Sequence, residues 1–111
     1  MTKILMLYKN YLFYDDSDTK ALAGTQTAFI ELSKAFWEIG CMVDVLTSTM
    51  NEHIENNYYW GNLNSNKIKS DYDLIIVNVS PHLFFDFRKI KAKKKFYGFI
   101  MKQSTCYFGI D

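Results

Sequence analysis

The first 47 residues carry an apolar run, then a long loop, a helical pattern and a second apolar run. Residues 4–8 read Ile-Leu-Met-Leu-Tyr, residues 25–39 have apolar side chains at helical spacing, and residues 42–47 read Met-Val-Asp-Val-Leu-Thr. Gly24 precedes the helical pattern and Gly40 follows it, at the position where glycine commonly ends a helix in a left-handed conformation. This order predicts a βαβ unit with two parallel strands and a right-handed crossover.

The expected helix over residues 25–39 has one apolar stripe that should face the sheet. Its members recur at the i, i+3, i+4, i+7 spacing of a core-facing helix and are Ala28, Phe29, Leu32, Ala35, Phe36 and Ile39. Ile30 and Trp37 lie off this stripe, seven residues apart, and we expect them to meet a neighbouring element.

Later segments predict the rest of a sheet. Residues 73–79 are rich in Leu, Ile and Val and resemble a buried parallel strand, whereas residues 58–60 predict a short edge strand. Pro81 suits the first turn of a helix over residues 81–91, and a last strand is expected over 95–101. The prediction is an α/β fold, a single Rossmann-like domain over residues 1–111 with a parallel sheet of about four strands.

Composition narrows the class of protein. The chain has 111 residues, of which 49% are hydrophobic and 17% aromatic, which favours a packed core over disorder. No apolar run approaches the ~20 residues that cross a bilayer, and the first residues lack the pattern of a secretory signal. We therefore expect a cytoplasmic protein.

Several short motifs together resemble the N-terminal domain of GT-B glycosyltransferases, family 4 in particular. The motifs are Lys3-Ile4-Leu5, the turn Ala23-Gly24, the helix segment 31–35, Gly40 with Val43, Val45 and Thr47, and the strand 71–78. They span residues 2–81. The chain departs from the family pattern at Ala23, where the family has a first glycine, and at Cys41, where it has a histidine.

The resemblance implies a function for the whole chain. It would be the acceptor-side domain of a transferase that moves a sugar from a nucleotide-sugar donor to a sugar or lipid acceptor, without a cofactor or a metal of its own. The family's donor-binding domain is not among these 111 residues, so a C-terminal domain or partner subunit is expected and activity in isolation is not. The alternative is a non-catalytic subunit of a split transferase or an inactive remnant that acts as an interaction module.

The glycine turn before the helix is the main candidate for ligand binding. Gly24, Thr25 and Gln26 open the helix where the chain returns from the carboxyl edge of the sheet. Backbone N–H groups and the helix dipole favour an anion there, and the resemblance implies a phosphate of the nucleotide sugar. A Gly-Thr helix start without any ligand is the alternative.

A second set of candidates follows the strand over residues 73–79. Asn78, Ser80 and His82 come at its carboxyl end, where doubly wound folds bind their ligands. His82 is a weak candidate for catalysis, because relatives can place a histidine near the reacting sugar. A surface histidine in the first turn of a helix is the alternative.

The loop between the first strand and the helix carries three acids, Asp15, Asp16 and Asp18. They could bind a metal ion or acceptor hydroxyls, but closely spaced acids usually form a solvated loop, and the glycine-containing calcium pattern is missing. We expect no metal site.

Charge is distributed unevenly along the chain. Residues 1–87 have a net charge of −5 and residues 88–111 a net charge of +6. The basic side chains concentrate in one run: Arg88, Lys89, Lys91, Lys93, Lys94 and Lys95. This run has three interpretations: a solvated helix C-terminus, a contact with an anionic membrane, or nucleic-acid binding. Nucleic acid is the least favoured, because no stacking platform or reading helix accompanies the run.

Overall fold

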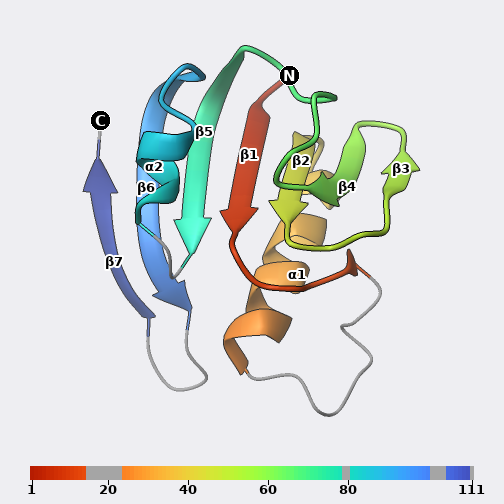
Figure 1. The fold of residues 1–111 in the computed structure, drawn as a ribbon, viewed down its shortest axis with the longest axis horizontal. Helices are drawn as coiled ribbons and strands as arrows, with labels where there is room; N and C mark the ends of the chain where they lie inside the picture. The colour runs from red at the N-terminus through yellow and green to blue at the C-terminus, as the bar shows by residue number, and fades with distance from the viewer. Residues whose placement is uncertain (15–23, 79–80, 101–104, 111) are drawn as a thin grey trace.

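The computed structural model describes residues 1–14, 24–78, 81–100 and 105–110, and shows one sheet with two helices (Figure 1). In this part of the chain the elements are β1 (Lys3–Tyr8), α1 (Gly24–Glu38), β2 (Met42–Thr47), β3 (His53–Glu55), β4 (Tyr58–Asn62), β5 (Asp71–Asn78), α2 (Leu83–Asp86), β6 (Lys91–Ile100) and β7 (Thr105–Ile110). Neither helix in the described residues is long and apolar enough to cross a membrane.

The described strands form a mixed, mostly parallel sheet in the order β3-β4-β2-β1-β5-β6-β7. The five inner strands are parallel, and β3 and β7 pair antiparallel at the two edges. The parallel strands lie in the spatial order third, second, first, fourth, fifth, which is that of a Rossmann-like α/β sheet. The chain reverses its direction of winding between β1 and β5, so this pair is the topological switch point.

The predicted βαβ unit is confirmed. β1 pairs in parallel with β2, and α1 connects them with bounds within one residue of those expected. Gly40 has φ of 101°, the left-handed conformation that the sequence predicted for the residue ending the helix. The buried strand predicted at 73–79 is β5, which begins two residues earlier than expected.

The helix predicted over residues 81–91 is wrong for most of its length. Only Leu83–Asp86 is helical, and the following residues lead into β6. The N–H of Lys91 donates to the carbonyl of Ser70, and Asp71 pairs with Lys91 in register. Residues 87–90 form turns and a bend, and pairing with β5 begins at Lys91, the last residue of the predicted helix. The basic run therefore is not a solvated helix C-terminus, because most of it lies in a strand.

The edges of the sheet also differ from the prediction. β4 is parallel to β2 and does not form the edge, because β3 pairs on its outer side. The strand predicted over residues 95–101 is β6, which starts earlier than expected, at Lys91. β7 pairs with β6 on its outer side. The described sheet therefore has five parallel strands where about four were expected, and it has two antiparallel edge strands that the weak patterns in residues 48–57 and 101–111 did not reveal.

Apolar side chains on the two faces of the sheet form two cores. The core under α1 contains Ile4, Met6, Tyr8, Leu12, Phe29, Ile30, Val43, Val45, Tyr58, Trp60 and Ile76. The core on the opposite face contains Leu5, Leu7, Met42, Leu46, Tyr59, Tyr72, Ile75, Val77 and Leu83. On this second face α2 and the segment 63–70 provide the cover, with Leu63, Ile68 and Phe87 packed against the core.

The buried face of α1 is rotated from the predicted stripe. Phe29 is buried as expected, but Ala35 and Ile39 are exposed and Ser33 is fully buried. The Ser33 hydroxyl donates to the Ile30 carbonyl at 2.6 Å and lies 2.8 Å from the Tyr58 hydroxyl. A polar residue can thus face the core because β4 supplies its partner.

The two side chains predicted to lie off the stripe do meet neighbouring structure. Ile30 is fully buried in the core under α1. Trp37 stacks on Tyr58 with ring centroids 5.0 Å apart, and its indole N–H donates to the carbonyl of Asn56. Trp37 thus contacts β4, whereas Ile30 packs in the core under α1.

Candidate functional site

The carboxyl ends of β1 and β5 meet at the switch point of the sheet. Tyr8, the last residue of β1, pairs in register with Asn78, the last residue of β5. In doubly wound folds the crevice outside these strand ends is where ligands bind. Figure 1 shows the arrowheads of β1 and β5 and the start of α1 at the same end of the molecule.

The first turn of α1 lies at this edge. The Phe29 ring packs on the Tyr8 ring with centroids 5.2 Å apart, and α1 runs antiparallel to the strands. Gly24, Thr25 and Gln26 lie one turn before Phe29 and so extend past the end of β1. The first N–H groups of a helix have no carbonyl partner within the helix and carry the positive end of its dipole. The position suits an anionic group.

Asn78 is the buried polar side chain of this edge. It is 1% exposed, and neither its amide nitrogen nor its amide oxygen has a hydrogen-bond partner in the described part of the chain. Strand alternation places it on the same face as Ile76, which packs in the core under α1. Leaving a buried polar group unpaired costs about 1–3 kcal/mol. A partner that satisfies both atoms must offer a donor and an acceptor, as a sugar hydroxyl does and a bare phosphate dianion does not.

His82 lies on the other face of the sheet, away from Asn78. It immediately precedes α2, whose Leu83 packs in the second core. The Nε2 atom of His82 is 3.2 Å from the Nζ atom of Lys9, the residue that follows β1. His82 and Asn78 thus lie on opposite faces of the sheet, and Ser80 lies outside the described residues.

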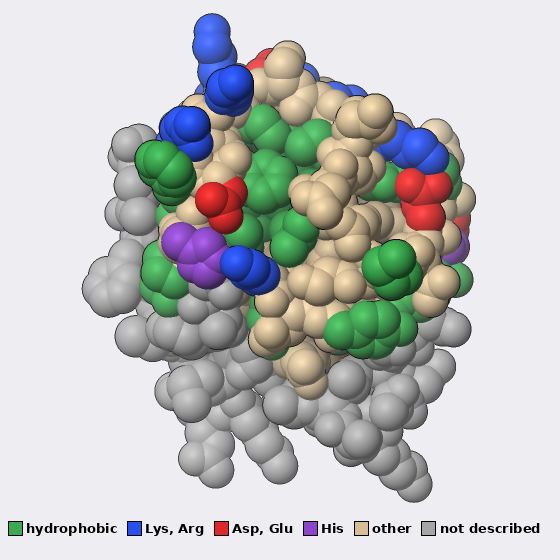
Figure 2. All heavy atoms as spheres, viewed as in Figure 1, with side chains coloured by type: hydrophobic (Ala, Val, Ile, Leu, Met, Phe, Trp, Pro, Cys, Tyr) green, Lys and Arg blue, Asp and Glu red, His purple; other side chains and the backbone are tan. Residues whose placement is uncertain are grey.

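An open depression of about 350 Å³ lies beside this lysine. It is lined by Lys9, Leu63, Asn64, Leu83, Asp86 and Phe87. Figure 2 shows one histidine, one basic and one acidic side chain side by side on this face. Lys9 was missed by the sequence reasoning, although its place directly after a buried parallel strand is the signal that could have revealed it.

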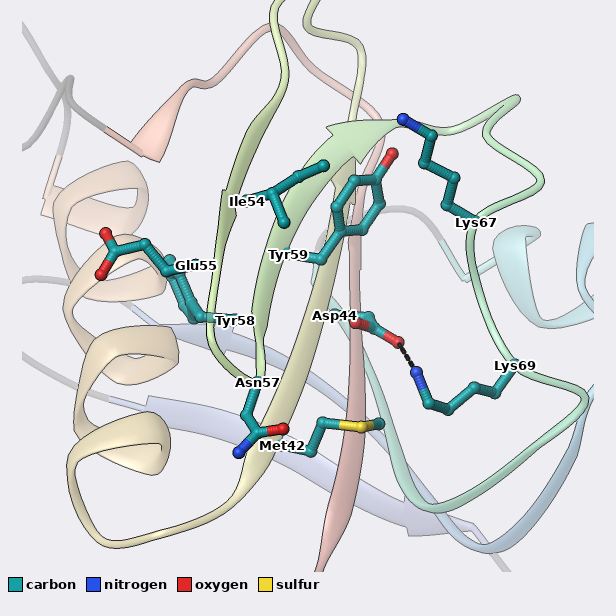
Figure 3. Close-up of a pocket in the computed structure, with 9 residues that line it drawn as sticks. All are labelled: Met42, Asp44, Ile54, Glu55, Asn57, Tyr58, Tyr59, Lys67 and Lys69. Atoms are coloured by element: carbon teal, nitrogen blue, oxygen red, sulfur yellow. Dashed lines mark ion pairs between the residues drawn. The ribbon is translucent and has the colours of Figure 1, made fainter.

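A second depression lies over the amino-terminal half of β2 (Figure 3). Its floor carries Asp44, 3% exposed, whose carboxylate accepts a hydrogen bond of 2.6 Å from the Tyr72 hydroxyl. Lys69 points toward the same carboxylate, with Nζ 3.8 Å from Oδ2, and its N–H donates to the Tyr72 oxygen. Burial, together with the hydrogen bond to Asp44, raises the pKa of Tyr72 and keeps it a donor. These groups satisfy one another, so we assign them a structural role.

Neighbouring polar side chains hold the segment 63–70 on the sheet in a similar way. The Tyr59 hydroxyl donates to Glu52 at 2.7 Å and lies 2.7 Å from the Ser65 hydroxyl. Lys67 pairs with Glu52 at 2.7 Å, and the hydrogen bonds from Lys67 and Tyr59 lower the pKa of Glu52. Polar contacts therefore fix this cover in a place where many α/β folds have a helix.

The described residues contain no group of three His, Cys, Asp or Glu side chains arranged to hold a metal ion. Asp15, Asp16 and Asp18, which the sequence offered as ligands for a metal or for acceptor hydroxyls, lie outside these residues. The candidate site therefore consists of the first turn of α1 and Asn78 on one face, and of Lys9 and His82 on the other.

Comparison with known proteins found no relative: no protein-family model, no curated protein and no solved structure matches this chain.

Proposed function

We propose that the chain is the acceptor-side domain of a glycosyltransferase, the N-terminal half of a GT-B fold that works with a nucleotide-sugar donor. The support is the resemblance over residues 2–81, joined to a Rossmann-like strand order with α1 opening at the carboxyl edge. A second domain or a partner subunit would hold most of the donor. This domain would contribute the turn at Gly24 and the contacts to the reacting sugars.

The observation that carries the proposal is the unpartnered, 1% exposed side chain of Asn78 at the switch point. Its donor and its acceptor match a sugar hydroxyl, whereas the first turn of α1 matches a phosphate. A sugar phosphate presents both kinds of group on one molecule. Asn78 and the first turn of α1 together therefore favour a sugar phosphate over a bare anion.

Chemistry at such a site would be positioning and electrostatic stabilisation. Holding the donor and the acceptor in line supplies much of the rate of a group transfer, and helix N–H groups stabilise the charge that develops on the leaving diphosphate. Lys9 is a further cation at the same edge and would face this charge from the second face of the sheet. No covalent step on a protein side chain is required.

The test is ligand binding by the ¹⁵N-labelled chain, followed through its side-chain amide signals. We expect uridine diphosphate glucose to move the Asn78 signal, which is assigned by its loss in Asn78→Leu. Inorganic phosphate should move backbone signals of the first turn of α1 and leave the Asn78 amide in place. Asn78→Leu should weaken binding of the nucleotide sugar about tenfold, the loss of one to two hydrogen bonds.

Asn66→Leu is the matched control, because it makes the same change at an exposed position outside the site and should leave the affinity unchanged. Gly24→Val tests the turn: its side chain should block the approach of the phosphate and weaken both nucleotide sugar and inorganic phosphate. A panel of nucleotide sugars and sugar phosphates that leaves every amide signal in place would overturn the proposal.

A further inference from the structure

Cationic side chains gather at the amino edge of the sheet, opposite the candidate ligand site. Arg88 and Lys89 follow α2, Lys91 and Lys93 begin β6, and Lys3 begins β1. The register brings Lys91 beside Asp71, so these strand starts lie together. Figure 2 shows basic side chains along the upper margin of the molecule, the end at which β5 and β6 begin in Figure 1.

Acidic side chains neutralise only part of this cluster. Lys3 pairs with Asp71 at 3.2 Å and Lys93 pairs with Asp73 at 3.1 Å. Arg88, Lys89 and Lys91 are exposed and form no ion pair within the described part of the chain. These three residues therefore leave a net positive surface where the chain passes from α2 into β6.

An exposed aromatic ring adjoins the same cations. Phe85 in α2 is 66% exposed, and the guanidinium of Arg88 lies 4.3 Å from the centroid of its ring. Arg88 also donates to the Phe85 carbonyl at 3.0 Å, which holds the charge and the ring together. Aromatic side chains beside basic ones are typical of protein surfaces that lie on a membrane interface, where the ring enters the headgroup region and the cations meet anionic lipid.

We propose that Phe85, Arg88, Lys89 and Lys91 form a docking surface for an anionic membrane. We choose a membrane as the partner because of charge complementarity and the exposed ring. A lipid surface offers negative headgroups for the cations and, directly beneath them, an apolar region for the ring. β6 continues the basic character through Lys93, Lys94 and Lys95, which lie farther along the strand. This surface is independent of the proposed transferase function, since it shares no residue with the carboxyl edge.

The experiment is co-sedimentation of the full chain with vesicles made of equal parts phosphatidylcholine and phosphatidylserine, and with vesicles of phosphatidylcholine alone. We expect binding to the anionic vesicles only, and binding that weakens steeply with added sodium chloride. Lys89→Gln/Lys91→Gln should lower the partition coefficient about 30-fold, since each cation near the headgroups contributes about fivefold. Phe85→Ser should lower it about tenfold.

Lys34→Gln, compared with the single variant Lys89→Gln, is the matched control, because it removes one charge from α1, away from this surface, and should leave binding nearly unchanged. Equal losses in these two single variants, or no binding to either kind of vesicle, would overturn the proposal. So would tighter binding to a duplex oligonucleotide that Phe85→Ser does not affect, because the surface would then serve nucleic acid. Circular dichroism of each variant verifies that the fold is kept.

Discussion

The polar side chains near the two ends of strand β5 differ in their hydrogen bonding. Near its start, the carboxylate of Asp73 accepts a hydrogen bond of 2.8 Å from the N–H of Lys3 and pairs with Lys93 at 3.1 Å. At its end, the amide of Asn78 is almost fully buried and has no partner in the described residues. One strand therefore carries a polar group that completes the sheet and another that the described chain leaves unsatisfied.

The satisfied group has a clear structural task. Tyr72 and Leu74 pair with β6 in register, whereas Asp73 between them does not. Tyr72 and Ile75 belong to the same core, so β5 changes face at this point. The Asp73 side chain takes the place of a backbone acceptor for the first N–H of β1. Within the described residues the Asn78 side chain makes no such hydrogen bond, and unpaired buried amides are rare in folded proteins.

The largest effect should come from breaking a buried pair that includes a carboxylate, Asp44 with Tyr72. Tyr72→Phe removes the donor and leaves a carboxylate that is 3% exposed, with Lys69, 3.8 Å away, as its ion-pair partner among the described residues. Stranding a buried charged acceptor should lower the free energy of unfolding by about 3 kcal/mol. Urea unfolding at neutral pH measures this change. The control Tyr11→Phe, at a 56% exposed position, should stay within about 0.5 kcal/mol of wild type.

If Tyr72→Phe unfolds at the wild-type urea concentration, the paired groups of this fold do not carry the stability ascribed to them. The conclusion that hydrogen-bonded polar groups stabilise this fold, in contrast to Asn78, would then be wrong.

Removing the unsatisfied group should have a smaller effect of the opposite sign. Asn78→Leu replaces an unpaired buried amide with an apolar side chain of similar size, next to Tyr8 in the register. We expect the free energy of unfolding to rise by about 1 kcal/mol, because the desolvation penalty of the amide disappears. Thermal and urea unfolding of the unliganded chain measure it. A destabilised variant would mean that the amide has a structural partner, and Asn78 would then leave the candidate site.

The buried parallel strands could be predicted because their side chains are apolar on both faces. β1 and residues 74–77 of β5 are continuous apolar runs, β2 is mostly apolar around Asp44, and Gly40 indicated the end of α1. The region 81–95 could not be predicted, since the apolar spacing of residues 83–90 suits a helix, whereas the helix ends at Asp86 and pairing with β5 begins at Lys91. Local periodicity contains no information about pairing with β5, so the position of the basic run was misjudged with it.

The sequence predicted where the candidate site lies better than it predicted which residues form it. The switch point follows from strand order, and the sequence placed Asn78 and the turn at Gly24 near the same edge. Which face each side chain takes depends on register, and this separates Asn78 from His82. The contact of His82 with Lys9 joins residues 73 positions apart, and no local pattern indicates it.

The smallest effect concerns the satisfied end of β5 and appears in the pH dependence of stability. Hydrogen bonds from the Lys3 N–H and from Lys93 lower the pKa of Asp73 below its ordinary value of 3.8. A carboxyl whose pKa is lowered in the folded state contributes stability above pH 3.8, and this contribution is lost as the pH falls through the folded-state pKa. Asp73→Asn should therefore be less stable than wild type between about pH 5 and 7, and the difference should vanish in stronger acid. The exposed neighbour Asp71, which pairs with the Lys3 side chain at 3.2 Å, supplies the control Asp71→Asn. Urea midpoints measured across this pH range should converge in acid for Asp73→Asn, and a constant gap down to pH 2 would show that the residue acts through its shape and not through its charge.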